Sequence, residues 1–317
     1  MSHHFLRASV ENCQWGFFDA KRAPVLSVRS GDTVTIDTVT GQPAFTPKAE
    51  DGFTILPELT EIHLRATERG PGPHILTGPI AIEGAKPGHV LEVRILAINL
   101  RQDWAYNAIL PLMGVLPNDF DEPRILIIRI DAERKVAKLP WGVDLPLAPF
   151  FGVMGVAPPP GWGRITTLMP RSMGGNLDNK DLGAGSILYL PVFNEGALFS
   201  CGDGHGAQGH GEVCVTAIET ALQGTFEFIL REDLSLSYPR AETSTHYITM
   251  GMDPDLDRCS EMALRDMIAL LHEIMSLSKA DAYSFCSVAA DFHVTQAVNG
   301  CKGVHAMIPK ALVRQMS

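Results

Sequence analysis

The chain has 317 residues, of which 45% are hydrophobic and 20% are charged, as in an ordinary soluble globular protein. Its 36 acidic and 26 basic residues give a net charge of −10, which argues against a nucleic-acid partner and against binding to an acidic membrane surface. The chain shows no run of 18 apolar residues and no secretory signal, so we expect a cytoplasmic protein with no membrane partner. The six cysteines form no Cys-x-x-Cys pair, which excludes a zinc ribbon.

From residue 30 to about residue 230, the sequence shows the alternation of apolar and polar residues that is typical of β-strands. Thr33–Thr40 and Val90–Leu100 each follow a turn that contains glycine, and both alternate with a period of two. Ile125–Ile130 adds a further short apolar strand. These segments predict an N-terminal β domain over residues 1–140.

The next part of the chain, residues 141–235, also consists of strands. A turn that contains glycine opens the strand Ser186–Phe193, the tight turn 194–196 predicts a hairpin of Ile187–Phe193 with Ala197–Cys201, and Thr225–Leu230 is a further strand. Frequent strands without long helices between them indicate a sandwich or a barrel rather than βαβ units. We therefore predict a β-barrel or sandwich segment here.

The pattern changes to helices in the last part, residues 236–317. Asp253 and Pro254 predict the start of a helix, and apolar residues then recur at helical spacing through Leu277. Ser278 resembles the N-cap of a second helix. The predicted fold is therefore mainly β with a smaller α+β part, in which a C-terminal helical hairpin packs on the sheet.

Residues 202–212 form a glycine-rich tract that carries two histidines and two acidic residues. Asp203 and His205 are two apart, and an extended chain places such a pair on one face. His210 and Glu212 have the same spacing, and glycine lets the backbone turn tightly enough to bring both pairs together. Carboxylates and imidazoles that meet at one point bind divalent metals. The alternative is a flexible loop of solvated polar residues.

Two further polar groups precede this tract. Asn176 and Asp178 are again two apart and follow a Gly-Gly turn, so both can face one cavity; alternatively, they hydrogen-bond their own backbone. His74 lies beside prolines, and Glu83 follows nine residues later. A lone histidine is usually a partly buried polar residue, and a lone glutamate is usually solvated.

Aromatic residues near the middle of the chain are candidates for a substrate pocket. Trp162 lies in the proline-rich loop 157–163, which is either a rigid connector or the rim of a pocket. Phe151 lies in an aromatic segment nearby. Together they could shape a pocket for an aromatic or long acyl group.

In a series of collinear motifs from about residue 30 onward, the chain resembles the acetamidase/formamidase family, which hydrolyses the C–N bond of small amides to a carboxylate and ammonia. The motifs are Thr-Gly-Pro-Ile-Ala-Ile-Glu-Gly-Ala (77–85), Pro-Phe-Phe-Gly-Val-Met-Gly-Val-Ala-Pro (149–158), Gly-Gly-Asn-Leu-Asp (174–178), Asp-Leu-Gly-Ala-Gly-Ser-Ile-Leu-Tyr-Leu-Pro-Val (181–192), the tract 202–212, Met-Gly-Met-Asp-Pro-Asp-Leu (250–256), Asp-Phe-His-Val-Thr-Gln (291–296) and Asn-Gly-Cys-Lys-Gly-Val-His-Ala-Met-Ile-Pro-Lys (299–310). The resemblance implies a jelly-roll-like β-sandwich, a β-barrel and a smaller C-terminal α/β part. It also implies a bound divalent metal, zinc or calcium, and a homodimer or higher homo-oligomer.

The resemblance also implies roles for individual residues. The positions that match the family's polar residues are Asn176, Asp178, Asp203, His205 and Glu212, with His74 and Glu83 as weaker matches. The chain departs from the family pattern at His210, where an aspartate is usual. An imidazole at this position favours zinc over calcium, unless the side chain lies away from the metal.

The sequence therefore predicts a metal-dependent amidase for small amides. Asp203, His205 and Asp178 would bind the ion, together with His210 if its ring reaches it. The proton carrier would be Glu212 or Glu83, while Asn176 would hold the metal or donate to the oxyanion. A serine or cysteine nucleophile lacks a convincing motif. The alternatives are a metal-binding β-sandwich without turnover and an amidase for a larger acyl or aryl amide.

Overall fold

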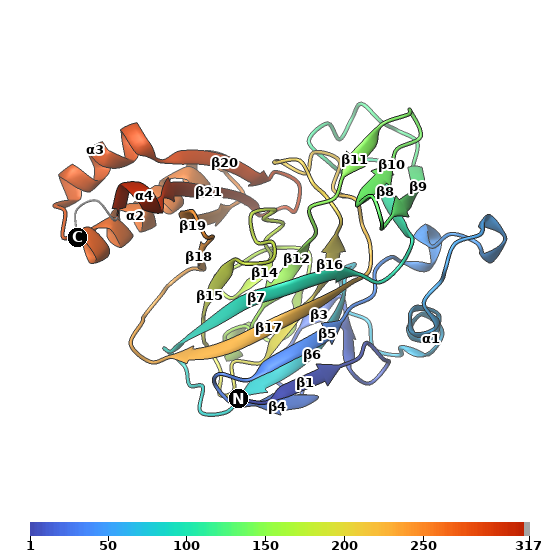
Figure 1. Ribbon diagram of the computed structural model, residues 1–317, viewed down its shortest axis with the longest axis horizontal. Helices are drawn as coiled ribbons and strands as arrows, with labels where there is room; N and C mark the ends of the chain where they lie inside the picture. Colours follow the sequence, from blue (N-terminus) through green and yellow to red (C-terminus); the bar gives the residue numbers. More distant parts are fainter. Residues whose placement is uncertain (314–317) are drawn as a thin grey trace.

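The structure is a computed structural model that describes residues 1–313, and its main feature is a pair of large β-sheets packed face to face (Figure 1). The larger sheet has nine strands, and all neighbours in it are antiparallel except the first two, which are parallel. Across the sheet, these strands are β1 (His3–Leu6), β5 (Thr33–Asp37), β17 (Leu222–Arg231), β7 (Val90–Leu100), β15 (Ile187–Pro191), β18 (Arg240–Glu242), β19 (His246–Asp253), β21 (Lys302–Pro309) and β20 (Asp291–Gln296).

The facing sheet carries the glycine-rich tract on one of its central strands. Its strands are β14 (Gly174–Asn176), β12 (Phe150–Gly155), β16 (Phe199–His205), β6 (Ile75–Ile82) and β2 (Cys13–Trp15), and β4 (Leu26–Val28) also pairs with β6. The tract therefore starts on a fully buried strand, β16, which lies between β12 and β6.

The core lies between these two sheets because each strand turns its apolar face inward. On β17, Phe226 and Phe228 alternate with half-buried polar residues, as expected for a strand with one buried face. Their rings meet Phe151 and Phe199 of the facing sheet, with ring centroids 5.4 Å apart for Phe151–Phe226 and 5.1 Å apart for Phe199–Phe228. Offset aromatic packing of this kind fixes how the two sheets face each other.

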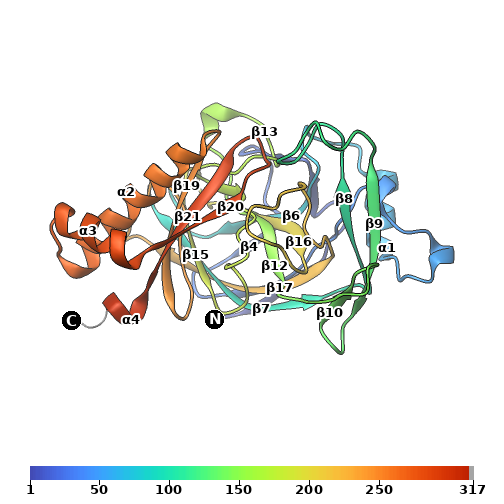
Figure 2. The same ribbon diagram turned by 90° about the horizontal axis from the view of Figure 1, so that it is seen from above.

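Smaller elements surround the sandwich. A four-stranded sheet lies at one end, and α1, a two-stranded sheet and three short 3₁₀ helices lie outside the two main sheets (Figures 1 and 2). Their bounds are β8 (Trp104–Ile109), β9 (Arg124–Asp131), β10 (Val136–Lys138), β11 (Asp144–Pro146), α1 (Pro57–Arg65), β3 (Phe17–Phe18), β13 (Ile165–Thr166), η1 (Pro43–Phe45), η2 (Ala49–Asp51) and η3 (Pro160–Trp162).

The C-terminal helices cover the other end of the nine-stranded sheet (Figures 1 and 2). The helices α2 (Leu256–Met275) and α3 (Lys279–Ala289) pack on β19 and β21, and α4 (Lys310–Val313) follows β21. A Cβ at Gly251 would overlap the backbone carbonyl of Cys259, so glycine lets α2 lie directly against β19. No described helix is long and apolar enough to cross a membrane.

The fold class predicted from the sequence is confirmed, and several element bounds are as well. β7 begins and ends at the predicted residues, and Ser278 caps α3 by accepting a hydrogen bond from the Asp281 amide. The helix α2, however, begins later than predicted. Its N-cap is Asp255, because Asp253 still pairs with Lys302 in the sheet.

The predicted hairpin between Ile187–Phe193 and Ala197–Cys201 is wrong. After β15, three successive residues with positive φ (75°, 57° and 64° at residues 196–198) carry the chain into the other sheet. β16 therefore pairs with β12 and β6 rather than with β15. Residues 1–313 also form no closed barrel, because the predicted barrel strands lie in open sheets. Strands on both sides of residue 140 share these sheets, and the three-part division of the chain stays a prediction.

Candidate functional site

Several acidic and imidazole side chains meet at one end of the six-stranded sheet. Asp203 and His205 lie on β16, and Asp178 follows β14. Glu219 forms β-bridges with both His205 and Tyr106, which bring it to the same place from the segment before β17. Asp178, Asp203, His205 and Glu219 are all buried.

The side chains converge over a glycine on the strand between β14 and β16. A Cβ at Gly152 would lie only 2.6 Å from Asp178 Oδ1 and 2.6 Å from Asp203 Oδ2. It would also lie 2.9 Å from Cε1 of His205. Gly152 therefore leaves room for the groups above it.

Many of the polar atoms in this cluster have no hydrogen-bond partner within the described chain. His205 Nε2 lies 3.3 Å from both Asp203 Oδ2 and Glu219 Oε2, in poor hydrogen-bond geometry. The buried atoms without a partner are Asn176 Oδ1, Asp178 Oδ1, His205 Nε2, Glu212 Oε2 and Glu219 Oε2. Ligand atoms of Asp178, His205 and Glu212 lie within 4.8 Å of one another, as do those of Asp203, His205 and Glu219. Buried polar atoms are normally satisfied, so this donor set fits a divalent cation.

Gln208 determines which nitrogen of His205 faces the cluster. Its amide Nε2 donates to the backbone carbonyl of Asp178 at 2.8 Å, so its Oε1 is the atom that lies 2.9 Å from His205 Nδ1. Nδ1 must therefore carry the hydrogen, which leaves the lone pair of a neutral ring on Nε2. A lone pair that points at carboxylates is unfavourable unless a proton or a cation lies between them, and this tautomer is the one that binds metals.

Burial and mutual repulsion shift the pKa values of the carboxylates. Burial raises the pKa of Asp178 to about 6, although the His205 imidazole opposes the shift. Burial also raises the pKa of Glu212 and of Glu219 above the usual range. At Asp203 burial acts in the same direction, but the imidazoles of His74 and His205 outweigh it and lower the pKa. The cluster thus holds protons that a bound cation would displace.

The backbone is strained at three of the acidic residues. Asp178, Asp203 and Glu212 have φ values of 47°, 57° and 45°, in the left-handed region that residues other than glycine rarely adopt. Such conformations cost about 1–3 kcal/mol each and tend to occur at functional sites. The fold therefore holds these side chains in place at a cost in stability.

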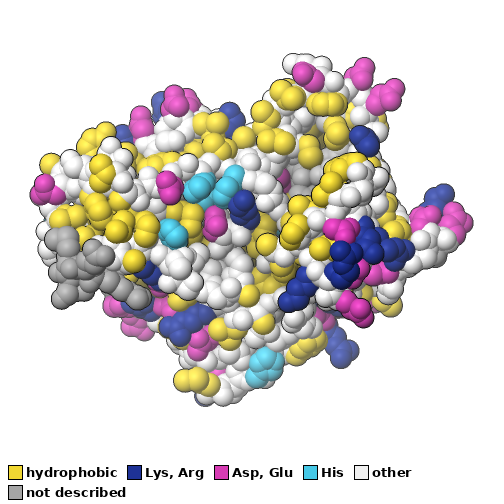
Figure 3. All heavy atoms as spheres, turned by 45° about the horizontal axis from the view of Figure 1, so that its top comes forward, with side chains coloured by type: hydrophobic (Ala, Val, Ile, Leu, Met, Phe, Trp, Pro, Cys, Tyr) yellow, Lys and Arg dark blue, Asp and Glu magenta, His cyan; other side chains and the backbone are white. Residues whose placement is uncertain are grey.

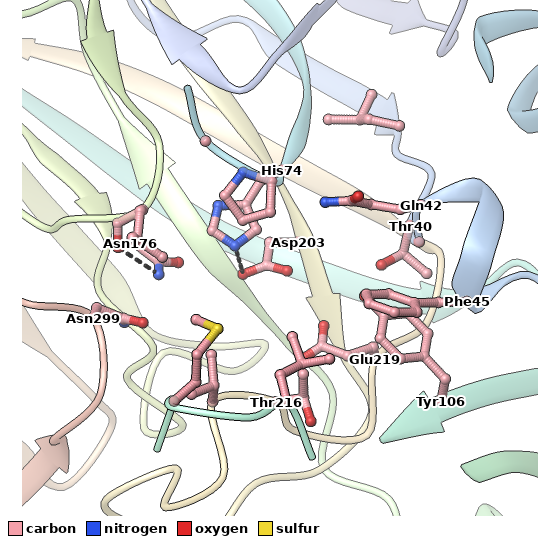
Figure 4. Close-up of a pocket in the computed structure, with 18 of the residues that line it drawn as sticks. Thr40, Gln42, Phe45, His74, Tyr106, Asn176, Asp203, Thr216, Glu219 and Asn299 are labelled. Carbon is pink, nitrogen blue, oxygen red and sulfur yellow. Dashed lines mark hydrogen bonds and ion pairs between the residues drawn. The ribbon is translucent and has the colours of Figure 1, made fainter. Parts of the chain in front are cut away.

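A cavity of about 360 Å³ opens beside the cluster. Asn176 and Asn299 lie on one side of it, Phe45 and Tyr106 lie on the other, and Asp203 lies between them (Figure 4). The cavity is also lined by His74, Glu212 and Glu219, together with apolar side chains that include Val39, Ile75, Leu110 and Met113. The lining therefore mixes polar and apolar side chains, and Thr40 and Gln42 lie beside Phe45 (Figure 4).

Two polar side chains on the cavity wall have defined orientations. The Asn176 amide nitrogen donates to the backbone carbonyl of Leu168 at 3.0 Å, which leaves its Oδ1 as a buried acceptor. His74 Nε2 lies 3.6 Å from Asp203 Oδ2 (Figure 4). Asn176 is therefore better placed to accept a hydrogen bond or bind a cation than to donate to an oxyanion.

Three candidates from the sequence lie elsewhere. Glu83 is exposed on the turn after β6 and pairs with Arg29 at 3.4 Å, so it cannot act in the cavity. Trp162 is 45% exposed, and its ring faces the Arg171 guanidinium rather than the cavity. Phe151 is fully buried because β12 turns it into the core between the sheets.

His210 also lies apart from the candidate metal ligands. Residues 206–212 form a loop rather than a strand, and positive φ angles at Gly211 and Glu212 turn consecutive side chains in different directions. Glu212 faces Asp178, whereas His210 packs on His293 and His305. The two-residue spacing therefore brought Asp203 and His205 together but not His210 and Glu212.

Four other residues at the site were not predicted from the sequence. Gln208 lies within the glycine-rich tract, and Asn299 begins the last family motif; Asn299 donates to Asp178 Oδ2 at 2.5 Å. Gly152 lies within the motif at 149–158, but only the fold shows what lies above it. Glu219 belongs to no motif, and only strand pairing brings it to the cluster.

Known proteins resemble this chain in both sequence and structure. A family model described as the Acetamidase/Formamidase family matches residues 23–161 and 163–314. An acetamidase from Mycolicibacterium smegmatis is 27% identical over 198 residues, which are 44% of this chain and 49% of that protein, so the match spans about half the length of this curated relative.

Two solved structures match almost the whole chain. A predicted acetamidase/formamidase from Thermoanaerobacter tengcongensis is 28% identical with a TM-score of 0.87, covering 100% of this chain and 99% of that one. An acetamidase from Bacillus halodurans is 31% identical with a TM-score of 0.83, covering 98% of this chain and 100% of that one. Since the family model matches nearly the full length, this chain belongs to the acetamidase/formamidase family.

Proposed function

We propose that this chain is a metal-dependent amidase that hydrolyses the C–N bond of a small amide to a carboxylate and ammonia. The observation that carries the proposal is the convergence of unpartnered, buried carboxylate and imidazole atoms above Gly152, next to a cavity of about 360 Å³. Membership of the acetamidase/formamidase family supports amide hydrolysis as the reaction.

The residues that would hold the ion are Asp178, Asp203, His205 and Glu219. When bound, a divalent cation lowers the pKa of water and polarises a carbonyl, which an unactivated amide requires. With His210 elsewhere, the case for zinc rests on the single imidazole of His205, and the surrounding carboxylates also suit calcium. Because an imidazole is among the proposed ligands, we still expect zinc first and calcium second as the bound ion.

We assign proton transfer to Glu212. Burial raises its pKa well above the usual range, which makes the ionised Glu212 carboxylate a stronger proton acceptor than an exposed one. It borders the cavity, and its Oε2 has no partner among the described residues. In this assignment Glu212 takes a proton from the attacking water and passes it to the amide nitrogen, which leaves as ammonia. Asn176 Oδ1 would accept a hydrogen bond from the substrate amide and orient it.

The test is ammonia release from formamide and acetamide by the purified protein, before and after removal of metal by a chelator. We expect chelation and the Glu212→Gln variant each to lower the rate at least about a hundredfold. Glu83→Gln is the matched control, because that carboxylate is exposed on the surface. Full activity in the metal-free protein would contradict the metal-dependent mechanism. Metal binding without ammonia release from any amide would instead support a binding protein without turnover.

The size of the cavity and the aromatic rings in its lining favour a second candidate, an amidase for a larger acyl or aryl amide. Acetamide has only four non-hydrogen atoms, whereas cavities of roughly 300–1,000 Å³ hold much larger ligands. Phe45 and Tyr106 pack with ring centroids 5.2 Å apart and offer an aromatic surface opposite Asn176. Comparing kcat/KM for formamide, acetamide and benzamide separates the two candidates. The homo-oligomer and the cytoplasmic location stay predictions.

A further inference from the structure

Three histidines gather outside the candidate amidase centre, together with one aspartate. His210 comes from the loop after β16, while His293 on β20 and His305 on β21 are direct partners across the sheet. One ring nitrogen from each lies within 4.8 Å of the others. Asp181 Oδ2 lies 3.1 Å from His305 Nε2 and 3.9 Å from His210 Nε2.

The three imidazole rings pack directly against one another. Ring centroids lie 4.6 Å apart for His210–His293, 5.2 Å for His293–His305 and 5.3 Å for His210–His305. His210 Nδ1 is buried and has no partner within residues 1–313. Imidazole rings that meet in this way can each offer one nitrogen to an ion between them.

His305 is also held in place by a neighbour on β20. Its Nδ1 lies 2.7 Å from the hydroxyl of Thr295, and its ring is fully buried. Nε2 is hydrogen-bonded to Asp181 Oδ2 at 3.1 Å, and because a carboxylate accepts, Nε2 carries the hydrogen when no ion is bound. An ion would replace this hydrogen, and Nδ1 would then donate to the Thr295 oxygen. Metal-binding histidines typically have their second nitrogen fixed in this way.

The cluster is accessible from solvent and contains none of the proposed ligands of the amidase centre, although Glu212 borders both cavities. A second, open cavity of about 620 Å³ is lined by Asp181, Gln208, His210 and Glu212. His210 and Asp181 keep 28% and 27% of their side-chain surfaces exposed. Histidine side chains gather next to acidic and basic ones on the face shown in Figure 3. An ion could therefore reach this cluster without passing through the cavity of about 360 Å³.

We propose that His210, His293, His305 and Asp181 form a second metal site, for a divalent ion of the zinc type. The three imidazoles supply three ligands of a zinc site, Asp181 borders two of them as the nearest candidate for the fourth, and imidazole disfavours calcium. The ion would join the loop that carries Glu212 to the β20–β21 hairpin. That loop already contacts the hairpin through hydrogen bonds between Gly211 and the backbone at Thr295 and Ala297.

The experiment is a titration of chelated protein with Zn²⁺, followed by calorimetry and by measurement of zinc per chain. We expect the wild type to bind one more zinc ion per chain than His210→Ala and than His293→Ala. His272→Ala, an exposed histidine near the end of α2, is the matched control and should keep the wild-type stoichiometry. Equal zinc content and affinity in the wild type and in the His210→Ala/His293→Ala double variant would overturn the proposal.

A second measurement does not depend on the folding of any variant. In the wild-type protein, zinc should protect His210 from modification by diethyl pyrocarbonate, as mapped by mass spectrometry, whereas partly exposed His246 should react equally with and without zinc. Modification of His210 at the same rate at saturating zinc would also overturn the proposal. Both measurements are independent of amide hydrolysis, so the second site can hold even if the proposed amidase activity does not.

Discussion

Replacing Gly152 by alanine tests the geometry of the candidate metal centre directly. The added methyl group would lie 2.6 Å from one oxygen each of Asp178 and Asp203, whereas a carbon and an oxygen normally stay about 3.3 Å apart. Both carboxylates must therefore move by several tenths of an ångström. Overpacking of this size costs about 1–3 kcal/mol of folding stability.

The larger effect should be on metal binding. An ion present at a hundred times its Kd stabilises the folded wild type by about 2.7 kcal/mol. In Gly152→Ala the methyl group occupies the space where the donors meet, so we expect this stabilisation to disappear and ammonia release to be lost. Thermal unfolding with added Zn²⁺ or with a chelator, measured on both proteins, gives the difference.

A control separates this effect from a general loss of stability. A Cβ at Gly183 would meet only the Pro149 carbonyl at 3.8 Å, an ordinary contact, so Gly183→Ala should keep both the metal-dependent stabilisation and the activity. Circular dichroism would establish that Gly152→Ala is folded. A folded Gly152→Ala protein that hydrolyses amides at the wild-type rate and gains the same stability from metal would refute the reasoning.

Three further outcomes follow from the site. Gln208→Leu removes the acceptor for His205 Nδ1 and should weaken metal binding about 10–100-fold in calorimetry, whereas unchanged affinity would mean that the ring needs no such support. Because burial raises the pKa of Asp178 to about 6, a cation must displace its proton below that pH; affinity should therefore fall up to about tenfold per pH unit between pH 6 and pH 5, and a flat profile would contradict the shift. Phe45→Trp should lower kcat/KM for benzamide about tenfold or more while sparing formamide, and equal losses for both amides would argue against a substrate-facing wall.

Local patterns predicted those parts of the molecule that depend on local geometry. Period-two alternation located β7 to the residue, and the i, i+2 spacing brought Asp203 next to His205, because both lie on one strand. The same spacing failed at His210 and Glu212, where the chain is a loop with positive φ angles. A spacing rule holds only where the assumed secondary structure is present.

The rest of the site depends on contacts between segments far apart in the sequence. Glu219 reaches His205 through a β-bridge, and Asn299 reaches Asp178 across 121 residues. Neither contact produces a periodic pattern in the sequence that could have predicted it. Glu83 was a reasonable candidate by motif, but the turn after β6 leaves it facing solvent. Only the packed arrangement of the sheets decides which of several equivalent carboxylates is buried.

The left-handed backbone at Asp178, Asp203 and Glu212 has a consequence for how the centre would work. The donor atoms take up their positions during folding, before any ion or amide arrives, so little rearrangement is left for the moment of binding. Glycine at any of these positions would relieve the backbone and stabilise the chain, yet it would delete a proposed metal ligand or, at Glu212, the proposed proton carrier. Selection for thermal tolerance should therefore favour glycine at these three positions, whereas selection for turnover should favour the acidic residues.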